Sequence, residues 1–474
     1  MNTSLAAALA VRDLAVVWHP CTQMHDHETL PMLPIERAEG AWLYGHDGRR
    51  WLDAVSSWWT CLLGHRHPRI VSALKDQLDR LDHVMLAGFT HEPAILLAEE
   101  LVRIAPRNRA MAPVRDAATH AADAPGSDPA SLTRVFYADN GSSAIEVALK
   151  LSFHYWKNRG AGARTRFVAL TGGYHGETLG ALSVTDVPLY RDTYAPLLLA
   201  PLFAPSPDAY ERAPGESAAD CARRRLGELR ALLERHAHEV CAVIVEPLVQ
   251  CAGGMRMHDA SYVRGLRALC DEFDVHLIAD EIAVGFGRTG SLFACEQAGI
   301  APDFLCVSKG LTGGTLALSA VLTTENVYAA FYANYAAGKA FLHSHSYTGN
   351  PLACRAALAT LEVLREEPVL ERNRALAAHL ARALAPLSAH ANVADVRQTG
   401  MIAAVELVQD RRTRTPFPAH ERRGLRVYRY ALEHGALLRP LGNVVYFMPP
   451  FCITPDEIDR MVEVAVQGIE RAVA

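Results

Sequence analysis

The chain has 474 residues, half of them hydrophobic, and a formal net charge of -5. This length is sufficient for a large hydrophobic core and predicts a major domain with one or two smaller lobes. The slight acidic excess lacks the dense positive charge that binds nucleic acid or an anionic membrane, so the composition argues against both partners.

The N-terminal segment contains an apolar stretch that is interrupted by Arg12 and Asp13 and lacks a basic leader region. This pattern predicts neither an export signal nor a transmembrane helix. The ten cysteines are scattered, without a C-x-x-C pair or zinc-finger spacing, which favours reduced thiols over a disulfide framework. We therefore expect a cytoplasmic protein.

Short apolar runs typical of β-strands alternate with helical segments along the middle of the chain. The expected strands are residues 133–138, 166–171, 241–247, 275–281, 303–308 and 318–324. Between them, apolar residues recur at helical spacing, as in 142–160 and 261–273. This alternation predicts an α/β fold in which a mostly parallel sheet is covered by helices on both faces.

Composition also predicts the domain limits. Residues 1–65 are expected to contribute to a small lobe and to the active site, and residues 66–354 to form the large domain. From 355 to 474 the chain is first rich in alanine and leucine at helical spacing, which predicts a C-terminal small domain. Residues 108–131 are rich in Ala, Asp, Pro and Ser without an apolar period, which predicts a flexible surface insertion.

Lys309 comes directly after the apolar run 303–308 and directly before a glycine-rich turn. A lysine at a strand end often extends to solvent along its aliphatic stem. In apolar surroundings, however, its amine becomes less basic and therefore nucleophilic. Other residues have to decide between the two interpretations.

Three further groups lie at predicted strand ends, where open α/β sheets bind ligands. Gly141 and Ser142 begin a helix, whose N-terminus can bind a phosphate or be capped by the chain itself. Asp280 and Glu281 end an apolar strand, where a carboxylate needs a cationic partner or solvent. Tyr174 lies in a turn between glycines, where its ring can stack on a flat ligand.

Together with Lys309, these groups match the needs of pyridoxal 5'-phosphate (PLP). Its aldehyde needs an amine, its ring nitrogen a carboxylate, its ring plane an aromatic neighbour and its phosphate hydrogen-bond donors. No other common cofactor needs this combination. The sequence therefore predicts a PLP site.

Six motifs follow one another along the chain: "NGSSAIEVALK", "GGYHGET", "VIVEPLVQCAGGM", "LIADEIAVGFGRTG", "SKGLTGG" and "SYTGNPLA". In this order they resemble the class III (fold-type I) aminotransferases over nearly the whole chain. The resemblance implies a PLP-dependent enzyme that works as a homodimer with two shared active sites. It further implies that Lys309 binds the cofactor and moves a proton, that Asp280 contacts the pyridine nitrogen, and that Tyr174 stacks on the ring and contacts substrate.

The same resemblance implies further contacts with the cofactor and the substrate. Gly141 and Ser142 match phosphate-binding positions. The segment Ser344, His345 and Ser346 matches a stretch that reaches across the dimer interface to the other subunit's phosphate. His345 and Ser346 are accordingly expected to bind the cofactor, and Ser344 the substrate.

Four more motifs, "WHPCTQM", "DAVSSWWTCLLGHRHP", "EPLVQCAGGMRMH" and "LLRPLGNVVYFMPP", resemble family members of biotin biosynthesis. That resemblance implies 8-amino-7-oxononanoate as substrate, 7,8-diaminononanoate as product and S-adenosylmethionine, or in some relatives lysine, as amino donor. Trp58 and Arg439 match substrate-binding positions. At the substrate-contacting position Cys21 the family commonly has tyrosine, and at Glu177 it often has Asp, so a pair with Arg288 would have to absorb one extra methylene.

Two alternative functions remain. A class III enzyme for an ω-amino acid or a diamine is disfavoured by the pair Trp58 and Trp59 and by "RPLGNVVYFMPP". A metal hydrolase would need the histidines of "GHRHP" and "LHSHS" as ligands, but neither has H-E-x-x-H spacing, so no metal site is expected. A noncatalytic PLP-binding protein is disfavoured by Lys309.

Overall fold

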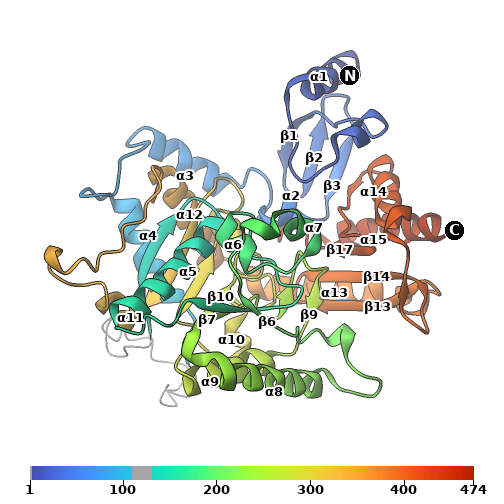
Figure 1. Cartoon of the computed structure of the whole chain (residues 1–474). Coiled ribbons are helices and arrows are strands. Elements are labelled where there is room, and N and C mark those ends of the chain that lie inside the picture. Colours follow the sequence, from blue (N-terminus) through green and yellow to red (C-terminus); the bar gives the residue numbers. More distant parts are fainter. Residues whose placement is uncertain (1–2, 109–130) are drawn as a thin grey trace. The chain divides into compact units, whose positions relative to one another are not determined.

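The computed structural model describes residues 3–108 and 131–474. They form two compact units (Figure 1): Met1–Pro68 with Asn373–Ala474, and Arg69–Arg372. The domain limit expected after residue 354 falls inside helix α12 (Pro351–Glu366), and the units divide after Arg372 instead. The reason is that α12 packs against α4 (Glu92–Ile104) of the larger unit. The insertion expected at 108–131 lies, apart from its two end residues, outside the described part of the chain.

The larger unit is built on a seven-stranded sheet in the order β4-β12-β11-β10-β7-β5-β6. Its strands are β4 (Leu132–Ala138), β5 (Arg166–Leu170), β6 (Leu202–Ala204), β7 (Val240–Val245), β10 (His276–Asp280), β11 (Phe304–Val307) and β12 (Ser319–Thr324). Only β12 runs antiparallel to its neighbours within this sheet. The predicted α/β fold with a mostly parallel sheet is therefore confirmed.

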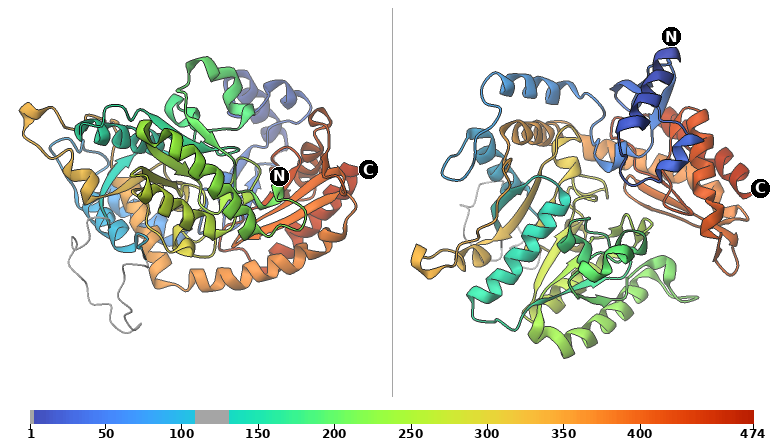
Figure 2. Two further views of the ribbon diagram at one scale, coloured as in Figure 1. Left: turned by 60° about the horizontal axis from the view of Figure 1, so that its bottom comes forward. Right: turned by 45° about the horizontal axis from the view of Figure 1, so that its top comes forward.

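Helices surround this sheet. The described helices of the larger unit, besides α4 and α12, are α3 (Pro68–Leu78), α5 (Gly141–Asn158), α6 (Leu179–Ser183), α7 (Pro188–Arg191), α8 (Ala218–His236), α9 (Ala260–Glu272), α10 (Cys295–Ala298) and α11 (Glu325–Ala329). Helix α5 packs against β7, β11 and β12, and α8 packs beside α9 (Figure 2). Because helices cover the sheet, β7, β10, β11 and β12 are buried at every residue, which explains why β7 and β11 are wholly apolar and why β10 and β12 have apolar centres. A short hairpin, β8 (Val249–Gln250) and β9 (Arg256–Met257), completes this unit.

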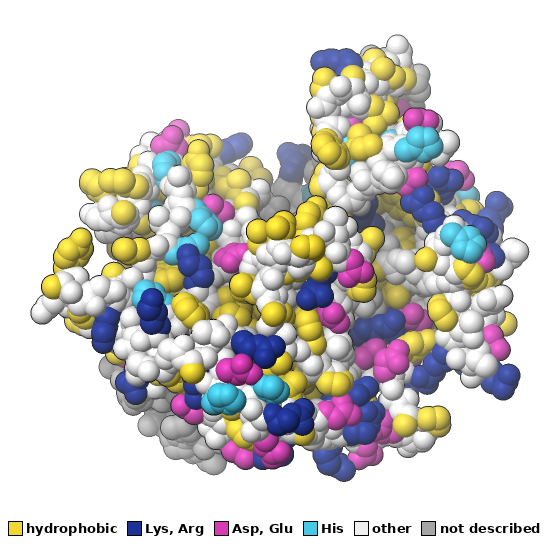
Figure 3. Space-filling view, in the orientation of Figure 1, with side chains coloured by type: hydrophobic (Ala, Val, Ile, Leu, Met, Phe, Trp, Pro, Cys, Tyr) yellow, Lys and Arg dark blue, Asp and Glu magenta, His cyan; other side chains and the backbone are white. Residues whose placement is uncertain are grey.

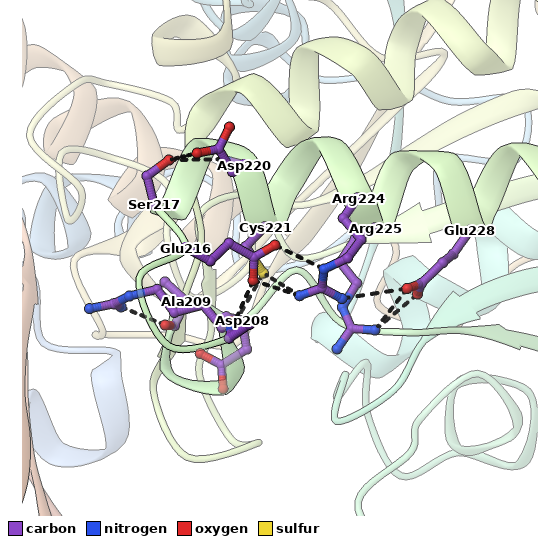
Figure 4. A network of polar contacts seen from close by, with 11 residues as sticks. Asp208, Ala209, Glu216, Ser217, Asp220, Cys221, Arg224, Arg225 and Glu228 are labelled. Carbon is purple, nitrogen blue, oxygen red and sulfur yellow. Dashed lines mark hydrogen bonds and ion pairs between the residues drawn. The ribbon is translucent and has the colours of Figure 1, made fainter.

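A network of polar contacts fixes the start of α8 (Figure 4). Ser217 caps the helix by accepting a hydrogen bond from the amide of Asp220. Glu216 pairs with Arg224, with the closest nitrogen and oxygen 2.8 Å apart, and the hydrogen bonds from Arg224 lower the pKa of Glu216 to about 2. Arg224 also reaches Glu228 one helical turn further on. The pair of Arg224 and Glu228, whose side chains are 38% and 37% exposed, is typical of a solvated helix face.

The smaller unit combines both ends of the chain. Its first sheet has the order β1 (Ile35–Glu39), β2 (Trp42–Gly45), β3 (Arg50–Asp53) and β16 (Ala436–Leu437), in which β16 runs parallel to β3. Its second sheet contains β13 (Val393–Thr399), β14 (Ile402–Asp410), β15 (Thr415–Pro416) and β17 (Val444–Phe447). Its helices are α1 (Thr3–Val16), α2 (Ser56–Trp59), α14 (Arg423–Glu433), α15 (Pro455–Val473) and most of α13 (Val369–Leu384). Across residues 3–108 and 131–474, no helix has the length and apolarity needed to cross a membrane.

Candidate active site

Lys309 begins a short 3-10 helix (Lys309–Thr312) directly after β11. Its backbone is in the left-handed region, with φ 43°, which is rare for a lysine and typical of strained functional positions. Burial lowers the pKa of Lys309, although the nearby side chains of Asp280, Cys251 and Glu246 act in the opposite direction. The amine is thereby made less basic, as the sequence predicted for a reactive lysine.

Asp280 is the last residue of β10, and its side chain is only 5% exposed. The Oδ2 atom lies 2.8 Å from Nδ1 of His175, and Oδ1 accepts a hydrogen bond of 3.1 Å from the amide of Ile282. The side chain of His175 is 1% exposed, and its amide donates to the hydroxyl of Thr185. The carboxylate is therefore held in one orientation inside the protein.

A second buried carboxylate, Glu246, lies in the same region and was not picked out from the sequence. It accepts hydrogen bonds from the amides of Tyr174 at 2.9 Å and Cys251 at 3.0 Å, one on each oxygen. Burial raises the pKa of Glu246 to about 7. The signal that could have found it is the one that found Asp280, because Glu246 also follows directly on a wholly apolar strand.

Tyr174 is held from two sides. Its amide donates to Glu246, and its hydroxyl donates to Oε1 of Glu177 at 2.8 Å. The ring meets that of Tyr190 edge to face, with the centroids 5.4 Å apart. Glu177 stands where the family often has Asp, and its longer side chain reaches the Tyr174 hydroxyl.

The N-terminus of α5 is the place where the cofactor phosphate is expected to bind. Asn140 caps the helix by accepting a hydrogen bond from the amide of Ser143. A Cβ atom on Gly141 would lie 2.9 Å from Ile282, and one on Gly176 would lie 2.3 Å from the hydroxyl of Ser142. Both glycines therefore keep side-chain bulk away from the helix N-terminus, which suits an anion.

The segment containing Ser344, His345 and Ser346 is irregular and largely exposed. His345 lies next to the start of α5, with Nδ1 3.2 Å from a carboxylate oxygen of Asp139. Its amide donates to the hydroxyl of Thr348.

The substrate-binding positions expected in the smaller unit lie together. The guanidinium carbon of Arg439 is 4.7 Å from the ring centroid of Trp58, and one of its nitrogens donates to the carbonyl of Cys21 at 3.3 Å. Trp58 keeps 39% of its surface exposed. Cys21 therefore contributes its backbone oxygen to this cluster.

These residues fit PLP. The larger unit contains a less basic amine, a buried carboxylate oriented by an imidazole, a fixed tyrosine ring and an open helix N-terminus. Each of these groups matches one part of the cofactor. In the described part of the chain, no group of three or more His, Cys, Asp or Glu side chains is arranged to hold a metal ion.

Residues 23–469 match the family Aminotransferase class-III, and the chain belongs to that family. It is a PLP-dependent aminotransferase. It is similar to the adenosylmethionine-8-amino-7-oxononanoate aminotransferase of Helicobacter pylori, with 44% identity over 468 residues and 98% of each chain covered. The protein of the same name from Nitratidesulfovibrio vulgaris is 46% identical over 462 residues, which cover 97% of this chain and 81% of the relative.

Solved structures of similar enzymes share the fold of this chain. The crystal structure of the adenosylmethionine-8-amino-7-oxononanoate aminotransferase from Methanocaldococcus jannaschii is 38% identical, with a TM-score of 0.88 and coverage of 98% of this chain and 99% of that one. An omega transaminase from Pseudomonas jessenii in complex with PMP is 29% identical, with a TM-score of 0.89 and 98% of each chain covered. The backbone fold is thus shared with both kinds of enzyme.

Proposed function

We propose that this chain transfers an amino group to 8-amino-7-oxononanoate and produces 7,8-diaminononanoate for biotin biosynthesis, with S-adenosylmethionine as the donor. The observation that carries the proposal is the cluster of Arg439 and Trp58. It offers a guanidinium for the distal carboxylate and an aromatic wall for the carbon chain. The relatives of this name, at 44% and 46% identity, support the same substrate.

An omega-transaminase activity on an ω-amino acid or a diamine is the second candidate. The observation that favours it is the TM-score of 0.89 to the Pseudomonas jessenii enzyme, against 0.88 to the Methanocaldococcus jannaschii enzyme. Sequence identity favours the first proposal, at 38% against 29%. Since the backbone of this chain is equally similar to both enzymes, the choice of substrate depends on side chains such as Arg439.

When bound, PLP supplies an aldehyde that takes up the amino group and a ring that withdraws electrons from the reacting carbon. Asp280, oriented by His175, would hold the pyridine nitrogen and favour its protonated form through a fixed negative charge. Lys309 would hold the cofactor through its amine, and its Nζ atom would accept and return the proton that moves during amino transfer. Burial lowers the pKa of Lys309, which favours the neutral amine that can accept a proton.

Other residues bind and orient. Tyr174, fixed by its two carboxylate partners, would stack on the ring and contact substrate. Gly141 and Ser142 would hold the phosphate at the N-terminus of α5. His345 and Ser346 would bind the phosphate of a second subunit, and Ser344 would bind the substrate.

A homodimer is part of the proposal. Large apolar side chains are exposed in two segments of the larger unit: Met85 55%, Phe89 58%, Ile95 46%, Leu96 44%, Tyr332 78%, Tyr335 101%, Leu342 91% and Tyr347 63%. The segments touch, because the rings of His83 and Tyr347 lie 5.0 Å apart. Hydrophobic side chains are also seen at the surface in Figure 3. Exposed apolar surface of this extent supports association with a second copy.

Separate half-reactions test the proposal. The protein loaded with PLP is mixed with S-adenosylmethionine, lysine or an ω-amino acid, and the loss of visible absorbance from the lysine-bound cofactor is followed. The aminated protein is then mixed with 8-amino-7-oxononanoate, and recovery of the absorbance is measured. Loss with S-adenosylmethionine and recovery with the oxononanoate are expected. Recovery only with other oxo compounds would favour the omega-transaminase alternative.

A further inference from the structure

Helix α2 is a left-handed turn made entirely of residues that avoid this conformation. Ser56, Ser57, Trp58 and Trp59 have φ angles of 50°, 44°, 71° and 73°. L-residues other than glycine disfavour the left-handed region, and consecutive examples are rarer still. Such strain persists only where the surroundings enforce it, and it is concentrated at functional sites. Trp58 lies in the middle of this turn.

The turn is held at its centre by Asp53, the last residue of β3, whose side chain is completely buried, and at its ends by Ser56 and Trp59, which donate to Met448 and Tyr446. The Oδ1 atom of Asp53 accepts hydrogen bonds from the amides of Ser57 at 2.9 Å and Val55 at 3.3 Å. Its Oδ2 atom accepts from the hydroxyl of Ser57 at 2.7 Å and from Nε2 of His65 at 2.9 Å. One carboxylate thus holds the backbone and the side chain of the residue before Trp58.

His65 is the first histidine of "GHRHP", which was considered as a metal ligand. Its Nε2 atom faces Asp53, and a carboxylate can only accept, so the hydrogen on Nε2 lies in that contact. The imidazole side chain is 17% exposed. In the structure, His65 donates the fourth of the hydrogen bonds that Asp53 accepts.

Asp53 also lies beside the start of the segment that carries Arg439. Strands β3 and β16 run parallel, and Asp53 is in register with Leu437, two residues before Arg439. The amide of Ala54 donates to the carbonyl of Leu437 at 3.2 Å. Both segments therefore leave neighbouring strand ends, and their side chains meet where Arg439 covers Trp58.

We propose that Asp53 and His65 are positioning residues for substrate recognition: they hold the left-handed turn so that Trp58 supports Arg439 at the distal carboxylate of a long-chain substrate. This inference rests on the proposed function, because it assumes that Arg439 binds that carboxylate. Neither residue is among those expected to bind the cofactor. Their loss should therefore weaken binding of the free acid and leave the chemical step unchanged.

The test uses the PLP-loaded full chain with Asp53→Asn, His65→Ala and His65→Gln. Asparagine places a donor where Oδ2 accepted, so we expect KM for 8-amino-7-oxononanoate to rise about tenfold, with kcat within about twofold of wild type. The same KM rise is expected for His65→Ala. His65→Gln should restore KM, because its amide nitrogen can reach the position of Nε2. The methyl ester of the substrate should be converted equally by all variants.

The matched control is Glu406→Gln, since Glu406 is also a buried carboxylate of the smaller unit, paired with Arg397 at 2.8 Å. Its kinetics should equal those of wild type whatever its stability. A readout without cofactor comes from titrating the apoprotein with nonanoate and following tryptophan fluorescence. Wild type, His65→Gln and the control should bind nonanoate about tenfold more tightly than Asp53→Asn and His65→Ala.

The outcomes separate the two proposals. If wild type itself does not distinguish the acid from the ester, the proposed function of Arg439 fails. If wild type prefers the acid and Arg439→Ala does not, but His65→Ala keeps the preference, the positioning role is overturned. Equal losses for acid and ester in the soluble variants would assign Asp53 and His65 to folding alone. If Asp53→Asn does not fold, the comparison of His65→Ala with His65→Gln tests the positioning role.

Discussion

The Nδ1 atom of His175 lies 2.8 Å from the Oδ2 atom of Asp280, and both side chains are almost completely buried. A charge placed and oriented in this way acts strongly on its surroundings, because little water screens it. In the proposed function, this pair would set the charge next to the ring nitrogen of the cofactor.

Asp280→Asn should slow single-turnover amino transfer by about 100-fold or more, because the amide cannot keep the ring nitrogen protonated. The apparent affinity for the amino donor should change much less. Stopped-flow absorbance with S-adenosylmethionine measures both quantities. Asp271→Asn, on the exposed face of α9, is the control. An unchanged single-turnover rate in Asp280→Asn would remove Asp280 from this role.

Lys309→Ala should abolish turnover, because no other amine replaces the one that carries the proton. The protein should still fold and retain cofactor noncovalently, which circular dichroism and cofactor content after gel filtration will measure. Lys157→Ala, in the last turn of α5, is the control and should remain active. Full activity of Lys309→Ala contradicts the whole assignment.

The pKa of Lys309 gives a prediction about pH. Only the neutral amine captures the cofactor, so the capture rate of the apoprotein should rise with pH and reach its midpoint below the pKa of an ordinary lysine. Asp280 raises the pKa of Lys309, and Asp280→Asn should therefore move the midpoint to lower pH. Stopped-flow mixing of apoprotein and PLP across pH gives the midpoint, and a shift to higher pH contradicts the prediction. Glu272→Gln changes an exposed carboxylate of α9 that pairs with Arg230, and it should leave the midpoint unchanged.

Gly176→Ala should weaken cofactor retention. Gly176 has φ 129°, and a Cβ atom would lie 2.3 Å from the Ser142 hydroxyl at the start of α5. The Kd for PLP, from absorbance titration of the apoprotein, should rise about tenfold or more, as expected when a fixed phosphate contact is displaced. Gly227→Ala is the control, because nothing lies within 4 Å of its new Cβ atom and alanine favours the helix by about 1 kcal/mol. Equal PLP affinity in both variants contradicts the expected crowding.

Arg439→Ala should lower kcat/KM for 8-amino-7-oxononanoate by about 10- to 100-fold, since a hydrogen bond to a charged group is worth about 1.5–3 kcal/mol. Lysine at this position should restore charge but only part of the bidentate geometry. Wild type should prefer the free acid over its methyl ester, and Arg439→Ala should lose most of that preference. The same preference in both proteins removes Arg439 from the substrate site.

The strands of the larger unit could be predicted because they are buried on both faces. Every residue of β7, β10 and β11 is buried, so β7 and β11 are uninterrupted apolar runs and β10 has an apolar run between His276 and Asp280. Strand β6 was missed, since Leu202–Ala204 has three residues between two prolines and resembles a loop. Lys309 and Asp280 were found because they end such runs.

The cluster in the smaller unit could not be predicted from local pattern. Trp58 and Arg439 lie in distant parts of the sequence, and only the family resemblance connected them. The turn Ser56–Trp59 contains no glycine to announce its left-handed backbone. Asp53 was likewise not recognised as a functional residue. Its four hydrogen bonds form only when the chain has adopted the left-handed turn, and the sequence does not indicate that turn.

Strand β3 pairs with β16, which lies near the other end of the chain. During synthesis β3 (Arg50–Asp53) leaves the ribosome long before β16 (Ala436–Leu437), so its edge stays unpaired while the residues between them are added. An open edge of this kind is a site for wrong pairing between nascent chains. The contact between Trp58 and Arg439 therefore cannot form until β16 has been synthesised and has paired with β3.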